Sequence, residues 1–166
     1  MSYKFDWEKD FEREPFCNAF GDETISFVLG EDAEAQILVF MTVKLIYKEK
    51  GIYHIHFGIE ERDVANNNES SGLDYSIECS KRYVPKSVRS IVLDAILDAL
   101  SCILDKASPK KVTMQSFYKA LPEKALKKYK KISDFMVERG YEVKEEFPDG
   151  NHGVRYWLYR QLPTRD

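Results

Sequence analysis

The sequence has few cysteines and no long apolar run. Cys17, Cys79 and Cys102 are its 3 cysteines, and they lie far apart. That spacing fits neither a disulfide framework nor the paired cysteines of a zinc site, so we expect reduced, structural thiols. No apolar run approaches the roughly 18 residues that a spanning helix needs, and no cationic segment followed by an apolar one opens the chain. We therefore expect a cytoplasmic protein with no membrane partner.

Composition and charge limit the class of protein further. Hydrophobic residues make up 43% and aromatic residues 13% of the chain, which excludes a disordered protein and predicts a single domain over residues 1–166. Residues 1–80 hold 17 acidic and 7 basic side chains, whereas residues 81–166 hold 11 and 18. This asymmetry indicates either ordinary solvated faces or separate acidic and basic surfaces for different partners.

A run of lysines between residues 119 and 131 raises the question of nucleic-acid binding. The net charge of −3 and the pI near 5.7 lack the strongly basic footprint of such proteins. Lys128 and Lys131 also lie opposite the apolar stripe of the helix expected there, which favours a solvated helix face. We therefore do not expect a nucleic-acid partner.

The first half of the chain has the pattern of an antiparallel meander. β-Branched and aromatic runs predict strands at Thr24–Leu29 and Ile37–Tyr47. Strand Ile52–Glu60 alternates, with Tyr53, Ile55, Phe57 and Ile59 on one face and His54 and His56 on the other. The polar segment Asn66–Gly72 predicts a mobile loop, and a fourth strand is expected around Asp74–Val84.

The second half has helical periodicity. Apolar residues recur at three- and four-residue steps from Ser87 to Leu104, which predicts a heavily buried helix. A strand at Lys111–Phe117 and a second helix ending at Arg139-Gly140 follow. Tyr141–Phe147 and Val154–Leu162 flank a turn-rich segment at 148–153 and predict a closing β-hairpin. The fold class expected is α+β, with a mostly antiparallel mixed sheet and two main helices.

This order of elements, together with two short motifs, resembles the GNAT superfamily of acyl-CoA N-acyltransferases. Val84-Pro85 followed by the helix that contains Ala95–Leu100 is similar to the family's strand, acyl-CoA loop and long helix. Phe135–Val143 is similar to the family's Tyr-Glu-Lys-x-Gly-Phe-Glu pattern. The resemblance covers about residues 37–162. It implies two central strands that splay apart if the cofactor is still bound, and strands that stay paired if it is not.

Two chemical parts of that family are not matched. The family's loop is rich in glycine because bare backbone amides must approach a pyrophosphate at a helix N-terminus. Lys86–Ile91 fills that position without glycine, so the Cβ atoms of Val88 and Ile91 would crowd the phosphates. The tyrosine that serves the family as general acid aligns with Met136, whose thioether cannot protonate a thiolate. Tyr129 and Tyr141 are possible substitutes.

If the chain is nevertheless an enzyme, the resemblance implies acetyl-CoA bound by Arg89, Ser90 and backbone amides. Glu78 and Tyr141 are then the candidate general base and general acid. Among the other titratable side chains, Glu60 and Glu61 are carboxylates near the central strands, and imidazoles such as His54 and His56 titrate near neutral pH. The structural alternative for the carboxylates is a solvated position at a strand end. For the imidazoles it is a covered face of the sheet.

A metal site would have to start from the His54-x-His56 pair, because alternate strand residues point the same way. A third ligand from His152, Asp74 or Glu78 is not demanded by any spacing in the sequence. We therefore predict no metal site.

Two functions remain as hypotheses. The one we favour is a non-catalytic GNAT-like protein without a cofactor that binds another protein as a regulator, inhibitor or immunity-type factor. The aromatic residues of the N-terminal segment are a candidate contact patch for this partner. Alternatively, they pack on the core, either as a short amphipathic helix or in another conformation. These residues are Phe5, Trp7, Phe11, Phe16 and Phe20. The alternative is a divergent acetyl-CoA-dependent N-acetyltransferase.

Overall fold

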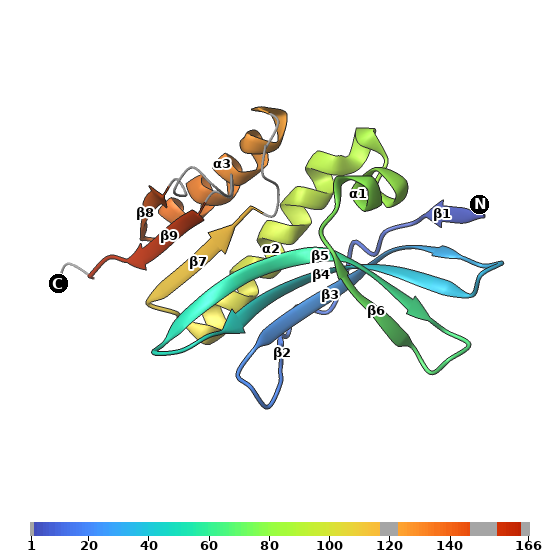
Figure 1. Ribbon diagram of the computed structural model, residues 1–166, viewed down its shortest axis with the longest axis horizontal. Helices are drawn as coiled ribbons and strands as arrows, with labels where there is room; N and C mark the ends of the chain where they lie inside the picture. The colour runs from blue at the N-terminus through green and yellow to red at the C-terminus, as the bar shows by residue number, and fades with distance from the viewer. Residues whose placement is uncertain (1, 117–122, 147–155, 164–166) are drawn as a thin grey trace, which may run out of the picture.

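The computed structural model describes residues 2–116, 123–146 and 156–163 (Figure 1). Within them lies one mixed sheet, in the order β1-β3-β4-β5-β7-β9-β8, with β2 also beside β3 and β6 also beside β5. The strands are β1 Tyr3–Phe5, β2 Phe16–Cys17, β3 Glu23–Asp32, β4 Ile37–Tyr47, β5 Ile52–Asp63, β6 Glu69–Asp74, β7 Lys111–Gln115, β8 Tyr141–Glu146 and β9 Tyr156–Gln161. Among these described strands, β5 and β7 pair in parallel and the other pairs are antiparallel.

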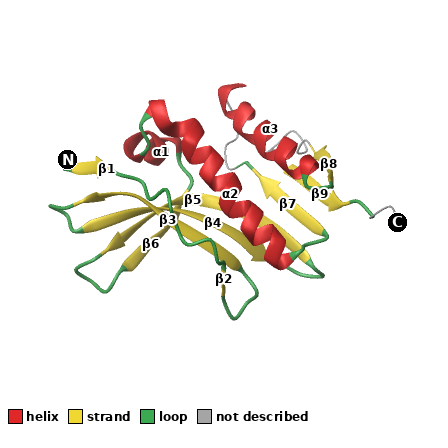
Figure 2. Cartoon of the chain, turned by 180° about the vertical axis from the view of Figure 1, so that it is seen from behind, coloured by secondary structure: helices red, strands yellow, loops and turns green. Residues whose placement is uncertain are grey.

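The helices lie on one face of the sheet, where Figure 2 shows α2 (Arg89–Ala107) and α3 (Glu123–Glu138) in front of the strands. Alternate residues of β3, β4 and β5, such as Phe27, Val43 and Ile55, point to this face and are at most 3% exposed. Helix α2 presents Ala99, Ile103 and its other apolar residues to them. The expected mixed α+β class, the two main helices and the C-terminal hairpin are confirmed.

The expected strand at Asp74–Val84 is wrong, because helix α1 occupies Ile77–Tyr83. Ser76 caps this helix: its hydroxyl accepts a hydrogen bond from the backbone N–H of Cys79. Cys79 and Tyr83, one turn apart, are buried against the core. Val84 is the extended residue after the helix, and the 3-10 turn η1 (Lys86–Val88) leads into α2. The segment before Val84-Pro85 is therefore helical.

The predicted loop at Asn66–Gly72 is shorter than expected. Strand β6 begins at Glu69 and pairs with the end of β5, where Glu69 lies opposite Asp63. The turn that remains uses positive φ angles at Asn67 (57°) and Asn68 (60°), a conformation that asparagine tolerates.

The N-terminal segment forms no helix at Trp7–Phe11. Phe11 is 4% exposed and stacks on Phe27 with ring centroids 4.7 Å apart, and Trp7 meets the edge of the same ring. Phe5 is half-buried. These three aromatic residues pack on the core, whereas Phe16 and Phe20 remain 71% and 81% exposed.

Two further observations concern the described residues. The three cysteines are free thiols. Of the helices in the described part of the chain, none is long and apolar enough to cross a membrane. The end of the predicted strand at Phe117 and the turn at 148–153, with His152, fall outside the described residues.

Candidate functional site

The residues expected to form an active site are separated in the fold. Glu78 lies exposed in the first turn of α1. Tyr141 opens β8, is 5% exposed, and donates its hydroxyl hydrogen to the carbonyl oxygen of Pro109 at 2.7 Å. Burial raises the pKa of Tyr141 above its ordinary value. The Tyr141 hydroxyl is therefore tied to the backbone at a strand end.

The residues expected to hold acetyl-CoA lie at the start of α2. Arg89 and Ser90 are both exposed, and the Arg89 side chain donates to the Val84 carbonyl oxygen at 3.2 Å. Val88 packs partly against the core, and Ile91 is 47% exposed. No side chain of the described residues caps this helix N-terminus by a hydrogen bond.

Met136 and Tyr129, the residues considered for the role of the family's general acid, are both buried. Met136 is fully buried, as expected for a core residue of α3. Tyr129 stacks on Trp157 of β9, with ring centroids 4.7 Å apart and an interplanar angle of 7°. Tyr129 is 6% exposed, so its ring belongs to the contact between α3 and the sheet.

His54 and His56 lie side by side on the face of β5 away from the helices. Their ring centroids are 4.8 Å apart. His54 Nδ1 is 2.5 Å from the Thr113 hydroxyl oxygen of β7, and His56 Nδ1 is 2.9 Å from the Tyr75 hydroxyl oxygen. Burial lowers the pKa of His54 to about 4, and burial also lowers that of His56. At neutral pH, burial therefore favours the uncharged form of both imidazoles.

This histidine pair has hydrogen-bonding partners where a metal site would need further ligands. Among the described residues, no group of three or more His, Cys, Asp or Glu side chains is placed to hold a metal ion. Asp74, one proposed third ligand, accepts a hydrogen bond from the Ser76 backbone N–H at 2.7 Å. His152 lies outside the described residues.

The carboxylates near β5 are also engaged. Glu60 is 9% exposed and accepts hydrogen bonds from Thr42 (2.8 Å) and Arg62 (3.1 Å). Burial alone would raise the pKa of Glu60, but hydrogen bonds from Arg62, Ser70 and Thr42 bring it below its ordinary value. Glu61 accepts a hydrogen bond from the Tyr83 hydroxyl. An ionised carboxylate with a lowered pKa is a weak general base.

One edge of β5 is shared between two neighbours. Residues Ile52–His54 pair with β7, and β6 pairs with β5 from Ile59 onward. The four residues between them, Ile55–Gly58, pair with neither strand in the described register. Strands β5 and β7 consequently diverge after His54, as Figure 1 shows.

Side chains from other elements lie on this stretch of β5. Lys128 Nζ of α3 lies 5.2 Å from the centroid of the Phe57 ring and 4.9 Å from that of Tyr129. Lys128 is half-buried, and burial lowers its pKa, so the expected solvated position for this residue is wrong. Lys131 is 44% exposed and pairs with Asp94 of α2 at 2.5 Å.

Among the residues that the structure describes, the most exposed aromatic side chains belong to a tightly held hairpin formed by Phe16–Thr24, called here the aromatic hairpin. Its turn is organised by Asn18, whose side-chain oxygen accepts hydrogen bonds from the backbone N–H groups of Phe20 (2.9 Å) and Asp22 (3.0 Å). Asp22 in turn accepts from the Tyr47 backbone N–H at 2.9 Å. The turn therefore fixes Phe20 at its tip while leaving the ring 81% exposed.

The base of the aromatic hairpin is fastened to α2. Lys106 Nζ donates to the Pro15 carbonyl oxygen at 2.6 Å and lies 3.5 Å from carboxylate oxygens of Glu14 and Glu23. Glu14 is 77% exposed, so acidic charge flanks the two phenylalanines. In Figure 1 this hairpin, labelled β2, projects from the lower edge of the sheet.

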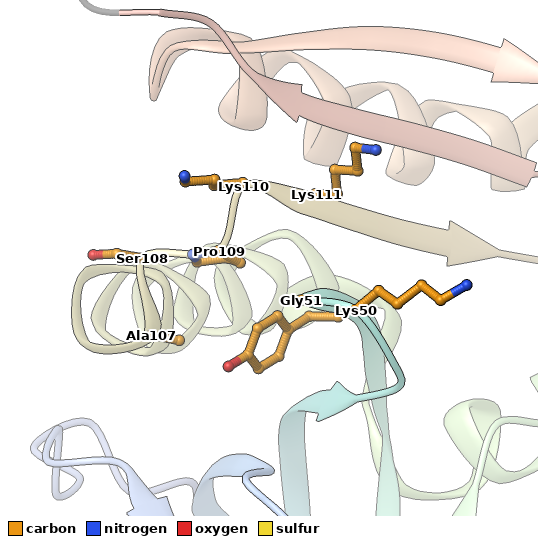
Figure 3. Close-up of a pocket in the computed structure, with 8 residues that line it drawn as sticks. Lys50, Gly51, Ala107, Ser108, Pro109, Lys110 and Lys111 are labelled. Carbon is orange, nitrogen blue, oxygen red and sulfur yellow. The ribbon is translucent and has the colours of Figure 1, made fainter.

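A shallow pocket of about 290 Å³ lies where α2 ends and β5 and β7 begin (Figure 3). Its lining includes Tyr53, Ala107 and Pro109, and Lys50, Lys110 and Lys111 stand around it. Figure 3 shows the Lys110 side chain extending away from those of Lys50 and Lys111. Because the ammonium groups do not converge, the pocket is poorly suited to one small anion.

The histidine pair and the exposed phenylalanines could be predicted in part from the sequence. The alternation of β5 predicted the histidine pair, and the N-terminal aromatics included Phe16 and Phe20. Tyr75, Thr113 and Lys128 carried no local signal, since each meets β5 from a distant segment. No family model, curated protein or solved structure matches this chain in the comparisons.

Proposed function

We propose that the chain is a non-catalytic GNAT-like protein that acts by binding another protein, as a regulator, inhibitor or immunity-type factor. The aromatic hairpin carries this proposal. Phe16 and Phe20 are 71% and 81% exposed on a turn whose backbone is fixed by Asn18. Large aromatic side chains presented to solvent on a fixed backbone are typical of the residues that dominate protein interfaces.

Burying one exposed phenylalanine against a partner stabilises a complex by about 1.5–3 kcal/mol. Because the turn is already fixed, less conformational entropy is lost on binding than with a mobile loop. Two such residues on one hairpin therefore contribute about 3–6 kcal/mol towards the roughly 8 kcal/mol of a micromolar complex, so the surrounding contacts must supply the rest.

The positions of the enzymatic candidates support the absence of catalysis in this proposal. Glu78 is exposed on α1, while the Tyr141 hydroxyl is bonded to Pro109. Glycine is missing from the turn before α2, where the family places its pyrophosphate. On β5, Lys128 covers Phe57.

One observation favours the alternative, a divergent acetyl-CoA-dependent N-acetyltransferase. Strands β5 and β7 pair over three residue pairs, from Ile52↔Lys111 to His54↔Thr113, and then diverge. Diverging central strands are what the GNAT resemblance implies for a chain that still binds its cofactor. In that case Arg89 and Ser90 would contact the phosphates.

Titration calorimetry with acetyl-CoA separates the two proposals. For the non-catalytic protein we expect no binding heat up to about millimolar ligand, which corresponds to less than about 4 kcal/mol of binding free energy. Micromolar binding that is weakened in Arg89→Ala would overturn the proposal and establish the alternative. Lys127→Ala is the matched control, because it removes one exposed positive charge from α3 and leaves the residues of α2 unchanged.

A further inference from the structure

We infer that the aromatic hairpin binds a second copy of this chain, by inserting Phe20 into the lysine-rimmed pocket of that copy. This inference rests on the proposed function, since it takes the aromatic hairpin as the protein-binding element: in the dimer the hairpin is occupied, and the dissociated monomer presents it to another protein. Four observations carry it: the chemistry of the pocket, its charge, its size and its position beside the hairpin.

The pocket has the chemistry that an exposed phenylalanine requires. Tyr53, Ala107 and Pro109 give it an apolar lining. Its volume of about 290 Å³ exceeds the roughly 150 Å³ of an apolar cavity that holds benzene. It is open to solvent at Gly51, where an added Cβ would meet no atom within 4 Å. A phenyl ring can therefore enter without displacing backbone.

The charges of the two surfaces are complementary. Lys50, Lys110 and Lys111 are exposed around the pocket, and no salt bridge within the described residues involves them. Glu14 at the base of the aromatic hairpin is 77% exposed. Lysines that stand apart around an apolar floor suit an acidic, aromatic protein surface better than a single small anion.

The two surfaces adjoin at one end of the molecule. Asp22 of the aromatic hairpin accepts the backbone hydrogen bond of Tyr47. The Tyr47 ring meets that of Tyr53 at 5.3 Å, and Tyr53 lines the pocket. A twofold axis at this end therefore brings each hairpin to the other copy's pocket, which gives two equivalent contacts and closes the assembly as a dimer.

Sedimentation equilibrium over a range of protein and salt concentrations tests this inference. We expect a monomer–dimer equilibrium that weakens as salt rises, because charges of opposite sign meet at the rim. Phe20→Ser and Lys110→Glu should each raise the dimer dissociation constant by at least about tenfold. Val64→Ser and Lys127→Glu are the matched controls, since both residues are exposed and lie on other parts of the surface.

A mixture of the two disruptive variants gives the decisive measurement. One copy with Phe20→Ser retains its pocket, and one copy with Lys110→Glu retains its hairpin, so the mixed dimer keeps one intact contact. We expect the mixture to associate more tightly than either variant alone. Circular dichroism of each variant checks that the fold is intact.

Two results would overturn the inference. One is a wild-type chain that stays monomeric at every concentration. The other is loss of the dimer in Phe20→Ser with no effect of Lys110→Glu and no gain on mixing, which would place the hairpins against each other. Neither result touches the acetyl-CoA titration, whose positive outcome alone removes the proposed non-catalytic function.

Discussion

The histidine pair shows how one strand position sets the charge state of a side chain. His54 is 9% exposed, between His56 and Thr113. Burial first, and then the neighbouring groups His56 and Lys48, lower its pKa to about 4. A histidine that is neutral in the folded chain and protonated in the unfolded chain makes folding sensitive to acid.

We therefore predict that stability falls as the pH drops from about 6.5 towards 4, the interval between the unfolded and folded pKa of His54. In this interval the unfolded chain binds the proton and the folded chain does not. The slope is at most about 1.4 kcal/mol per pH unit for one proton. Urea unfolding at several pH values measures it.

His54→Gln should flatten this dependence, because an amide does not titrate. His56→Gln should remove a smaller part of it, since the pKa of His56 is also lowered by burial. An unchanged slope in His54→Gln would contradict the assignment of the acid sensitivity to this residue.

Two glycines in strands allow a test of packing at single positions. A Cβ at Gly30 would lie 2.2 Å from the Lys4 carbonyl oxygen and 2.7 Å from the Tyr3 hydroxyl. A Cβ at Gly58 would lie 3.0 Å from the nearest atom and 3.1 Å from the Tyr75 ring. We predict that Gly30→Ala displaces β1 and costs about 2–3 kcal/mol, whereas Gly58→Ala costs about 1 kcal/mol. Chemical denaturation measures both, and the reverse ranking would refute the crowding argument.

At the scale of elements, α1 depends on one capping residue. The Ser76 hydroxyl accepts the Cys79 N–H, and this bond satisfies one of the first amides of a helix only two turns long. We predict that Ser76→Ala destabilises the protein by about 1 kcal/mol. Hydrogen exchange should show faster exchange at Cys79 and Ser80. Ser90→Ala, at an exposed position without a recorded capping bond, is the control.

Elements with a long, regular pattern could be predicted from the sequence. The β-branched and aromatic run of β4, the alternation of β5 and the helical period of α2 belong to elements of 11, 12 and 19 residues, and the structure has these elements where they were expected. A strand was expected at Asp74–Val84 because a helix of two turns has too few residues to show a helical periodicity of apolar side chains. Its signal was local: Ser76 in a capping position, with Cys79 and Tyr83 on one helical face.

The candidate sites could be predicted only in part, for a related reason. A sequence pattern shows which residues share a face of one strand, but it does not show what packs against that face. The Thr113 and Tyr75 hydroxyls reach the histidines from 59 and 19 residues away along the chain. Lys128 had the spacing of a solvated residue, but its ammonium group reaches the Phe57 ring of β5 from α3.

At the scale of the whole molecule, the sheet consists of two parts joined by a short seam. Strands β1 to β6 form one part, and β7, β9 and β8 form the other. Three residue pairs of β5 and β7 connect them, together with the contact between His54 and Thr113. Helix α2 packs on β3 and β4, while α3 packs on β8. Such a division favours partial unfolding of the smaller part.

We predict that native-state hydrogen exchange finds a lower opening free energy for Val112 and Tyr159 than for Phe27 and Val43, although all four side chains are fully buried. Thr113→Val should widen this difference, because it removes the hydroxyl beside His54 at the seam. Equal opening free energies for the two parts would show that the sheet unfolds as one cooperative unit.

The placement of β5 also restricts how this chain can change in length. Residues Tyr53–Asp63 pair with β4 along one side, and on the other side the strand pairs first with β7 and, from Ile59 onward, with β6. Inserting or deleting one residue within it would exchange its imidazoles with its core side chains from that point on. We expect that length variation is accepted in the turn at residues 64–68, and that within the strand such changes occur in pairs of residues or not at all.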